Sequence, residues 1–197
     1  MEDLTSHSKN SNNDEQTMAM QDNPPARKSV WSFRDKLVRL CWGTLGHLLW
    51  ILFPRFRSGI LRMFGAKIGH GCTFAQSVQI TIPWNIHMGD ECHIGEHAIL
   101  YSLGPITLGD RVRIDTRAHL CAGSHDMRDT KFPLSKPPIS IGSDCFIGVD
   151  AYIGPNVSLA QKICVYPRAS VYKTFREGGV QLIGNPASVM MGSEAYE

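Results

Sequence analysis

His125 is the residue whose type and position best suit acid–base chemistry. It is the last residue of the segment Leu120–His125, directly before the one long break, Asp126 to Ser140, in an otherwise regular repeat. Loops that leave a rigid scaffold often carry functional groups. An alcohol is a weak nucleophile until a positioned base removes its proton, and an imidazole does this near neutral pH. His125 is therefore a candidate general base that could activate a hydroxyl, with Asp126 or a backbone carbonyl orienting its ring.

A six-residue repeat supplies the scaffold for this histidine. A large apolar residue recurs every sixth position, often with glycine directly after it and a small or β-branched residue four places on. This period suits a short strand plus a tight corner, so that three hexads close one triangular coil. We expect the large residue to point inward and the glycine to supply corner conformations that a side chain would hinder. The large residues are Ile68, Phe74, Ile80, Met88, Ile94, Leu100, Leu108, Ile114, Leu120, Ile141, Ile147, Ile153, Leu159, Val165 and Val171.

The repeat predicts an all-β fold, a single-stranded parallel β-helix of about five coils preceded by N-terminal helices. The coils are expected at roughly 68–87, 88–107, 108–125, 141–158 and 159–174. The first two steps are two residues longer than three hexads, which indicates a bulge at one corner. The predicted β-helix spans residues 66–176 with an excursion loop at 126–140, and a C-terminal segment follows at 177–197.

The N-terminal part divides into two regions. Residues 1–28 are rich in Ser, Asn, Asp and Gln with few large apolar side chains, so we expect a disordered tail. Residues 29–65 are predicted to form a helical cap, broken near Pro54. The stretch 37–64 is apolar over much of its circumference, so a peripheral contact with a membrane stays open as an alternative.

The composition argues against several classes of binding partner and site. Twenty basic and eighteen acidic residues leave a net charge of +2, too small to indicate nucleic acid or an anionic membrane as the main partner. The six cysteines form no C-x-x-C pair, which argues against a zinc ribbon or a redox motif. No signal-peptide pattern is present, so we expect a cytoplasmic protein, with the inner membrane face as a peripheral location.

The sequence around the break resembles a known family, the colanic acid biosynthesis subgroup of the hexapeptide-repeat acetyltransferases. The resemblance covers about Ser32 to Val189 and implies a left-handed β-helix, a homotrimer, acetyl-CoA as co-substrate and a hydroxyl of a sugar or exopolysaccharide precursor as acceptor. The matching runs are Ala122-Gly123-Ser124-His125-Asp126, Phe132-Pro133-Leu134, Pro138-Ile139, Phe64 to Gly69, Pro83-Trp84-Asn85, Gly104 to Asp110 and Ile183 to Ala187.

The resemblance also implies a site. In the family, the histidine that matches His125 is the general base, and acetyl-CoA lies along the coils after the loop, at the junction of two subunits. Relatives commonly carry a basic residue after the Gly-Asn-Pro-Ala turn, where this chain has Ser188. The residues expected to bind the cofactor are Phe146, Gly148, Val149, Arg168, Ala169, Tyr172 and Lys173.

For the acceptor we name Trp84, Asn85 and Ser102. An aromatic face can stack on a sugar ring, although Trp84 could instead cover the corner bulge. No metal site is expected.

Two other functions stay open from the sequence. A β-helix without activity could act as a scaffold in polysaccharide assembly. The same fold also serves γ-type carbonic anhydrases, in which three histidines from two subunits bind zinc. His93 and His119 would join His125 in such a site, although their spacing does not match that family's pattern. His87, His93, His97 and His119 are otherwise expected on a solvated face.

Overall fold

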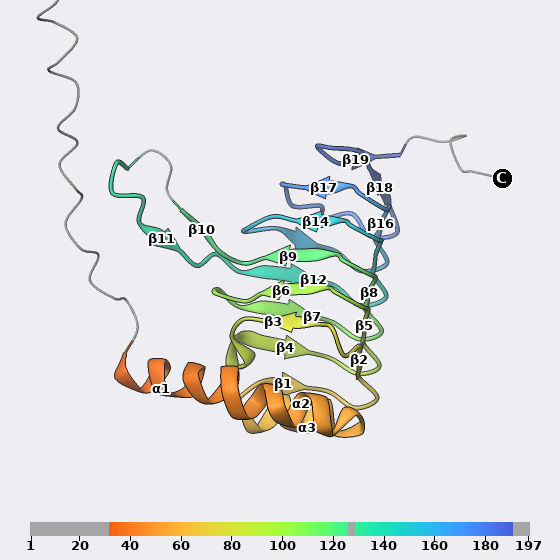
Figure 1. The fold of residues 1–197 in the computed structure, drawn as a ribbon. Coiled ribbons are helices and arrows are strands. Elements are labelled where there is room, and N and C mark those ends of the chain that lie inside the picture. Colours follow the sequence, from red (N-terminus) through yellow and green to blue (C-terminus); the bar gives the residue numbers. More distant parts are fainter. Residues whose placement is uncertain (1–31, 126–128, 191–197) are drawn as a thin grey trace, which may run out of the picture. The chain divides into compact units, whose positions relative to one another are not determined.

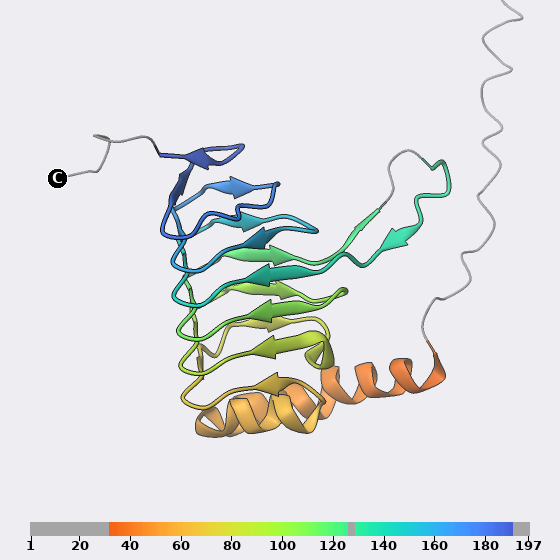
Figure 2. The same ribbon diagram turned by 180° about the vertical axis from the view of Figure 1, so that it is seen from behind.

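The computed structural model describes residues 32–125 and 129–190. In this part of the chain, short parallel strands stack into a three-sided column, and helices lie across its first rung (Figure 1). The same arrangement from behind shows one hairpin projecting from the column (Figure 2). The tail expected at 1–28 lies outside the described residues, as does Asp126.

The N-terminal helices predicted before the β-helix are confirmed. Its first helix has a capping box, in which the Ser32 hydroxyl accepts a hydrogen bond from the Asp35 N–H and the Asp35 carboxylate accepts one from the Ser32 N–H. No single helix in the described residues is long and apolar enough to cross a membrane; a pair bent by 116°, Asp35–Leu52 with Pro54–Met63, meets that test only when taken together. The elements are α1 (Phe33–Cys41), the π-helical turn η1 (Trp42–Gly46), α2 (His47–Leu52), the 3₁₀ turn η2 (Pro54–Phe56) and α3 (Arg57–Met63).

Three parallel sheets form the sides of the column. The first contains β1 (Lys67–Ile68), β4 (Ile86–Met88), β7 (Ile106–Leu108), β12 (Ile139–Ile141) and β15 (Ser158–Leu159). The second contains β2 (Thr73–Phe74), β5 (His93–Ile94), β8 (Arg113–Ile114), β13 (Phe146–Ile147), β16 (Cys164–Val165) and β18 (Gln181–Ile183), with β19 (Ser188–Val189) antiparallel at its edge. The third contains β3 (Gln79–Ile80), β6 (Ile99–Tyr101), β9 (His119–Cys121), β14 (Tyr152–Ile153) and β17 (Ser170–Val171).

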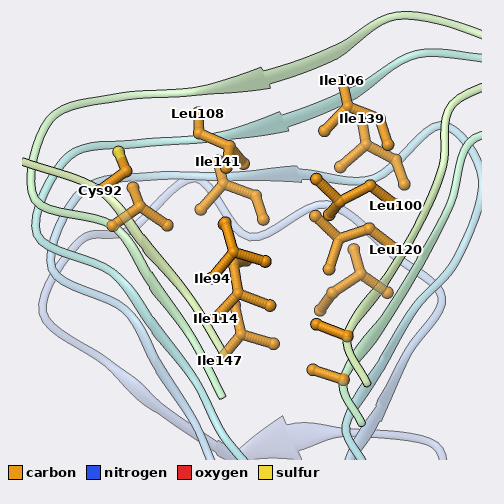
Figure 3. Packing of buried hydrophobic residues seen from close by; sticks show 14 of the residues in the cluster. Cys92, Ile94, Leu100, Ile106, Leu108, Ile114, Leu120, Ile139, Ile141 and Ile147 are labelled. Carbon is orange, nitrogen blue, oxygen red and sulfur yellow. The ribbon is translucent and has the colours of Figure 1, made fainter. Parts of the chain in front are cut away.

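The predicted register is confirmed by the pairing. Ile94, Ile114 and Ile147 are partners on successive rungs and stack in one inward column (Figure 3). All the large residues of the repeat are buried. The second sheet has one rung more than predicted, because Leu182 pairs with Val165 and is fully buried. The chain therefore makes about six turns, and the last turn departs from the six-residue spacing.

The fold requires glycine at these positions of the repeat for a different reason from the one expected. Among the described glycines, positive φ occurs only at Gly65, Gly71, Gly179 and Gly184, none of which follows an inward residue of the repeat. A Cβ on Gly142 would instead lie 2.6 Å from the backbone nitrogen of Gln161 on the next rung. The expectation that these glycines supply corner conformations is therefore wrong; they allow the close approach of stacked backbones. Left-handed corners are occupied by other residues, including Glu91, His97, Arg111, Arg117, Asp144, Asp150, Lys162 and Arg168.

Ion pairs connect these corners from rung to rung. The Arg111 Nε atom lies 2.6 Å from Asp144 Oδ1, and the Arg117 Nε atom lies 2.7 Å from Asp150 Oδ1. In both pairs the guanidinium also donates a second hydrogen bond to the other carboxylate oxygen. These contacts hold the pKa of both carboxyl groups below its ordinary value.

Candidate active site

His125 lies on the hairpin that leaves the column between β9 and β12. Strands β10 (Ser124–His125) and β11 (Leu134–Ser135) pair antiparallel, with His125 opposite Leu134. The Ser135 hydroxyl donates a hydrogen bond of 3.1 Å to the Ser124 carbonyl and strengthens the base of the hairpin. The break in the repeat therefore begins as an ordered two-stranded projection (Figures 1 and 2). His125, on its first strand, is exposed.

A backbone carbonyl sets the tautomer of His125. The Nδ1 atom lies 2.8 Å from the carbonyl oxygen of Phe132. Because a carbonyl oxygen can only accept, Nδ1 must carry the hydrogen, and Nε2 of the neutral ring keeps its lone pair. Of the two orienting groups named from the sequence, the carbonyl makes this contact within the described residues.

A tight turn holds that carbonyl in place. Phe132 has a φ of +43°, a conformation that bulky side chains rarely adopt. Its N–H donates a hydrogen bond of 2.8 Å to the Asp129 carbonyl, and the Lys131 N–H donates one of 2.8 Å to the Asp129 carboxylate. Strained backbone of this kind persists where the surroundings fix it, often at functional sites. The turn thus aims the Phe132 carbonyl at the imidazole.

The corner below the hairpin contains the residues named for the acceptor. Asn85 donates amide hydrogen bonds to the carbonyls of Ser102 at 2.8 Å and Leu103 at 2.9 Å. Ser102 is fully buried, and its hydroxyl both accepts from and donates to the backbone of Ile82 at 2.9 Å. Asn85 and Ser102 therefore hold the corner together, and Ser102 has no surface open to an acceptor.

Trp84 differs from its neighbours because it is half-buried beside open space. It belongs to the 3₁₀ turn η3 (Pro83–Asn85), which lies between β3 and β4. The indole lines a groove of about 560 Å³ whose other side comes from the helices. The remaining lining residues are Asp35, Leu37, Val38, Cys41, Met63, Phe64 and Gly65.

The residues expected to bind a cofactor fall into two groups. Val149 and Arg168 occupy one corner on successive rungs, joined by a hydrogen bond of 2.8 Å from the Arg168 N–H to the Val149 carbonyl. Gly148 precedes them, and Phe146 lies on β13 of the same side. Tyr172 and Lys173 follow the far end of β17, at the corner from which the hairpin also departs. Ala169 is fully buried, so only its backbone could meet a ligand.

Exposed cations are available in both groups. The Arg168 side chain is 83% exposed, and its Nε atom is 3.8 Å from an Asp150 oxygen that Arg117 already binds closely. Lys173 places its ammonium 5.3 Å from the centre of the Phe175 ring and is exposed. Either side chain can reach an anionic group, although the two lie on different corners of one prism.

The sequence analysis missed a row of rings on the outer face of the third sheet. Tyr101, His119, Tyr152 and Tyr172 follow one another with centroid distances of 6.4, 5.5 and 5.6 Å. Burial lowers the pKa of His119, whose Nε2 atom is buried without a partner in the described structure. The expected solvated position is therefore wrong for His119. Aromatic residues at matching positions of neighbouring hexads were the signal that could have revealed this row.

The histidines of the zinc alternative are separated in this chain. His93 lies on β5, where its Nδ1 atom is 2.8 Å from the Thr73 hydroxyl, whereas His119 lies on β9 and His125 on β10. Across residues 32–125 and 129–190, no group of three or more His, Cys, Asp and Glu side chains could hold a metal ion.

Comparison with known proteins places this geometry in a family. Residues 138–160 match the family model described as hexapeptide repeat of succinyl-transferase. Over 136 residues the chain is 39% identical to WcaF of Escherichia coli (strain K12), named as a colanic acid biosynthesis acetyltransferase, with 69% of this chain and 74% of that protein covered. The chain belongs to the hexapeptide-repeat acetyltransferases. The family resemblance inferred from the sequence is thereby confirmed.

Solved structures of acetyltransferases share the fold. A hexapeptide-repeat acetyltransferase of Vibrio cholerae O1 biovar eltor, complexed with acetyl coenzyme A, superposes with a TM-score of 0.73 at 21% identity, covering 84% of this chain and 92% of that one. A galactoside acetyltransferase in complex with coenzyme A gives a TM-score of 0.69 at 19% identity, covering 83% and 84%. At these identities the likeness shows the β-helix alone.

Proposed function

We propose that this acetyltransferase moves the acetyl group of acetyl-CoA to a hydroxyl of a sugar or exopolysaccharide precursor, with His125 as general base. The single observation that carries the role of His125 is the 2.8 Å contact between its Nδ1 atom and the Phe132 carbonyl. This contact leaves Nε2 as the basic nitrogen of an exposed ring. The names of the relatives support the cofactor and the acceptor class, since one binds acetyl coenzyme A and others are named for a galactoside and for colanic acid.

The reaction follows from these groups. Nε2 of His125 takes the proton of the acceptor hydroxyl while the oxygen attacks the thioester carbon. The tetrahedral intermediate then collapses, the carbon–sulfur bond breaks, and the leaving CoA sulfur receives the proton from the imidazolium. The products are the acetyl ester and free CoA. The Phe132 carbonyl stabilises the imidazolium during the step, because its oxygen accepts the Nδ1 hydrogen throughout.

We infer that the cofactor site is shared between two copies of the chain. Arg168 lies at the corner between the second and third sheets, whereas His125 departs from the corner between the third and first sheets. Within a single chain the exposed Lys173 lies at the hairpin corner, but one full side of the prism separates Arg168 from the base. A neighbouring copy that brings its hairpin toward the Arg168 corner would join them, in keeping with the homotrimer implied by the family resemblance.

For the acceptor we assign Trp84 as the sugar platform. Its indole borders open space, whereas Asn85 and Ser102 have their polar groups engaged by the chain itself. The Trp84 corner and the hairpin corner lie on one edge of the column, because Gly104, which follows Ser102 and Leu103, donates a backbone hydrogen bond of 2.6 Å to the Ala122 carbonyl. An acceptor stacked on Trp84 would thus lie along the same edge as the base.

The test is turnover of acetyl-CoA with a panel of sugars and nucleotide sugars. His125→Ala should lower kcat by roughly 10²-fold or more, the usual scale for removing a general base. His93→Ala is the matched control, because this exposed histidine lies on β5 of another side. Equal turnover by wild type and His125→Ala would refute the role of His125. A chain that binds no acetyl-CoA in calorimetry would be a scaffold instead.

A further inference from the structure

The helical layer, residues 33–63, has an apolar outer face. In the described residues, ten of the thirteen large hydrophobic side chains that are exposed belong to this layer; the other three are Phe132, Tyr172 and Val189. Exposed apolar side chains gathered on one layer in this way indicate a contact with another body. Of the ten, Leu37 and Met63 line the groove beside Trp84. The eight that form the outer face are Phe33, Leu40, Leu45, Leu48, Ile51, Leu52, Phe53 and Phe56.

The inner face of the same layer is firmly attached to the column. The indole N–H of Trp42 donates to the Ile80 carbonyl and that of Trp50 to the Gln76 carbonyl, both at 2.9 Å. Arg57 is buried and donates a hydrogen bond of 2.7 Å to the Phe74 carbonyl. Since these contacts fix the orientation of the helices, the outer side chains cannot turn inward to find cover.

The charge of the layer selects the kind of partner. Residues 32–63 contain six basic residues and one acidic residue, a net charge of +5. Since the whole chain has a net charge of +2, the remaining residues have a net charge of −3. Lys36 and Arg55 are exposed beside the apolar face. A second copy would bring like charge against like charge, which disfavours pairing of two layers. An anionic lipid surface offers both phosphates for the cations and a headgroup–acyl boundary for the leucines.

We propose that the helical layer lies flat on an anionic membrane surface. The apolar outer side chains enter the boundary between headgroups and acyl chains, while Lys36 and Arg55 meet lipid phosphates. Helix α1 also forms one side of the groove that contains Trp84. Docking would therefore place the acceptor edge of the column beside the membrane. The docking itself follows from the helices alone and does not depend on the proposed reaction.

Sedimentation with vesicles tests the proposal. The full chain should sediment with vesicles of phosphatidylcholine and phosphatidylglycerol, and markedly less with phosphatidylcholine alone. The double variant Leu40→Glu/Leu48→Glu should lose about a hundredfold in partitioning, on the scale of about tenfold per buried leucine. These side chains are 64% and 54% exposed, so the exchange should leave the fold intact. Val189→Glu is the matched control, an exposed apolar residue at the opposite end of the column.

The charge contribution is tested separately. Lys36→Gln/Arg55→Gln should weaken partitioning by about fivefold per charge removed and reduce its salt dependence. Equal partitioning of wild type and Leu40→Glu/Leu48→Glu, or an equal loss in Val189→Glu, would overturn the proposal. A second pair of results would also overturn it: the wild-type chain does not bind vesicles, and the leucine variant changes the mass measured by sedimentation equilibrium. The helical layer would then join copies of the chain. Acetyl-CoA turnover in free solution should be the same in all these variants, which separates docking from catalysis.

Discussion

Replacing Gly142 with alanine should destabilise the column through a backbone clash. The added Cβ would lie 2.6 Å from Gln161 N, 2.7 Å from the Ala160 carbonyl carbon and 2.9 Å from Gln161 Cα, whereas ordinary contacts begin at 3.4 Å. Relief requires the rungs to separate by several tenths of an ångström. The hydrogen bond of 2.9 Å from Gly142 N–H to the Leu159 carbonyl would then approach its limit.

The magnitude follows from opposing contributions. Overpacking typically costs about 1–3 kcal/mol, and a weakened backbone hydrogen bond adds about 1 kcal/mol. The lower entropy of the unfolded alanine chain offsets about 0.4–1 kcal/mol. We therefore expect Gly142→Ala to lower the free energy of unfolding by about 2–3 kcal/mol, or Tm by about 4–12 °C at this chain length.

Thermal and urea unfolding followed by circular dichroism measure this effect. The matched control is Gly59→Ala, since Gly59 lies inside α3 and an added Cβ there meets no atom within 4 Å. That variant should gain about 0.5–1 kcal/mol from helix propensity and chain entropy. A Gly142→Ala chain as stable as wild type, or stabilised like Gly59→Ala, would refute the close-approach explanation of the repeat glycines.

Three further predictions concern the core, a corner and the base. Ile114→Ala should cost about 2–5 kcal/mol in urea unfolding, because Ile114 is fully buried in the inward column. At neutral pH the Tm of Asp150→Asn should be lower than that of wild type, and this difference should disappear as the pH falls below about 4. Arg117 holds the pKa of the Asp150 carboxyl group below its ordinary 3.8. The stabilisation by this ion pair is therefore present above pH 3.8 and is lost as the carboxyl group of the folded protein is protonated. Phe132→Gly should keep turnover within a few-fold, since glycine adopts positive φ and retains the carbonyl, whereas Phe132→Pro cannot adopt it and should lose tenfold or more. Loss in both variants would show that the Phe132 side chain, and not its carbonyl, supports His125.

The fold was readable because the repeat dictates each rung. An inward residue every sixth position places Ile94, Ile114 and Ile147 in register, and the pairing follows that register. The last turn was missed because Leu182 lies 17 residues after Val165, which breaks the period. The role of the glycines was also hidden. Periodicity shows that a position must be small, but contact between neighbouring rungs, as at Gly142, shows why.

The candidate site was only partly readable, for two physical reasons. His125 stood out because it ends the repeat, yet the carbonyl that orients it belongs to Phe132, and a backbone oxygen carries no residue signature. Ser102 was named for the acceptor, whereas burial decides that its hydroxyl bonds to the backbone of Ile82. The separation of His125 from Arg168 by one side of the prism gives the second reason why the site could not be predicted in full. The site proposed above is completed by a second copy, so it depends on how two surfaces meet, whereas the repeat of one chain specifies stacking along its own axis only.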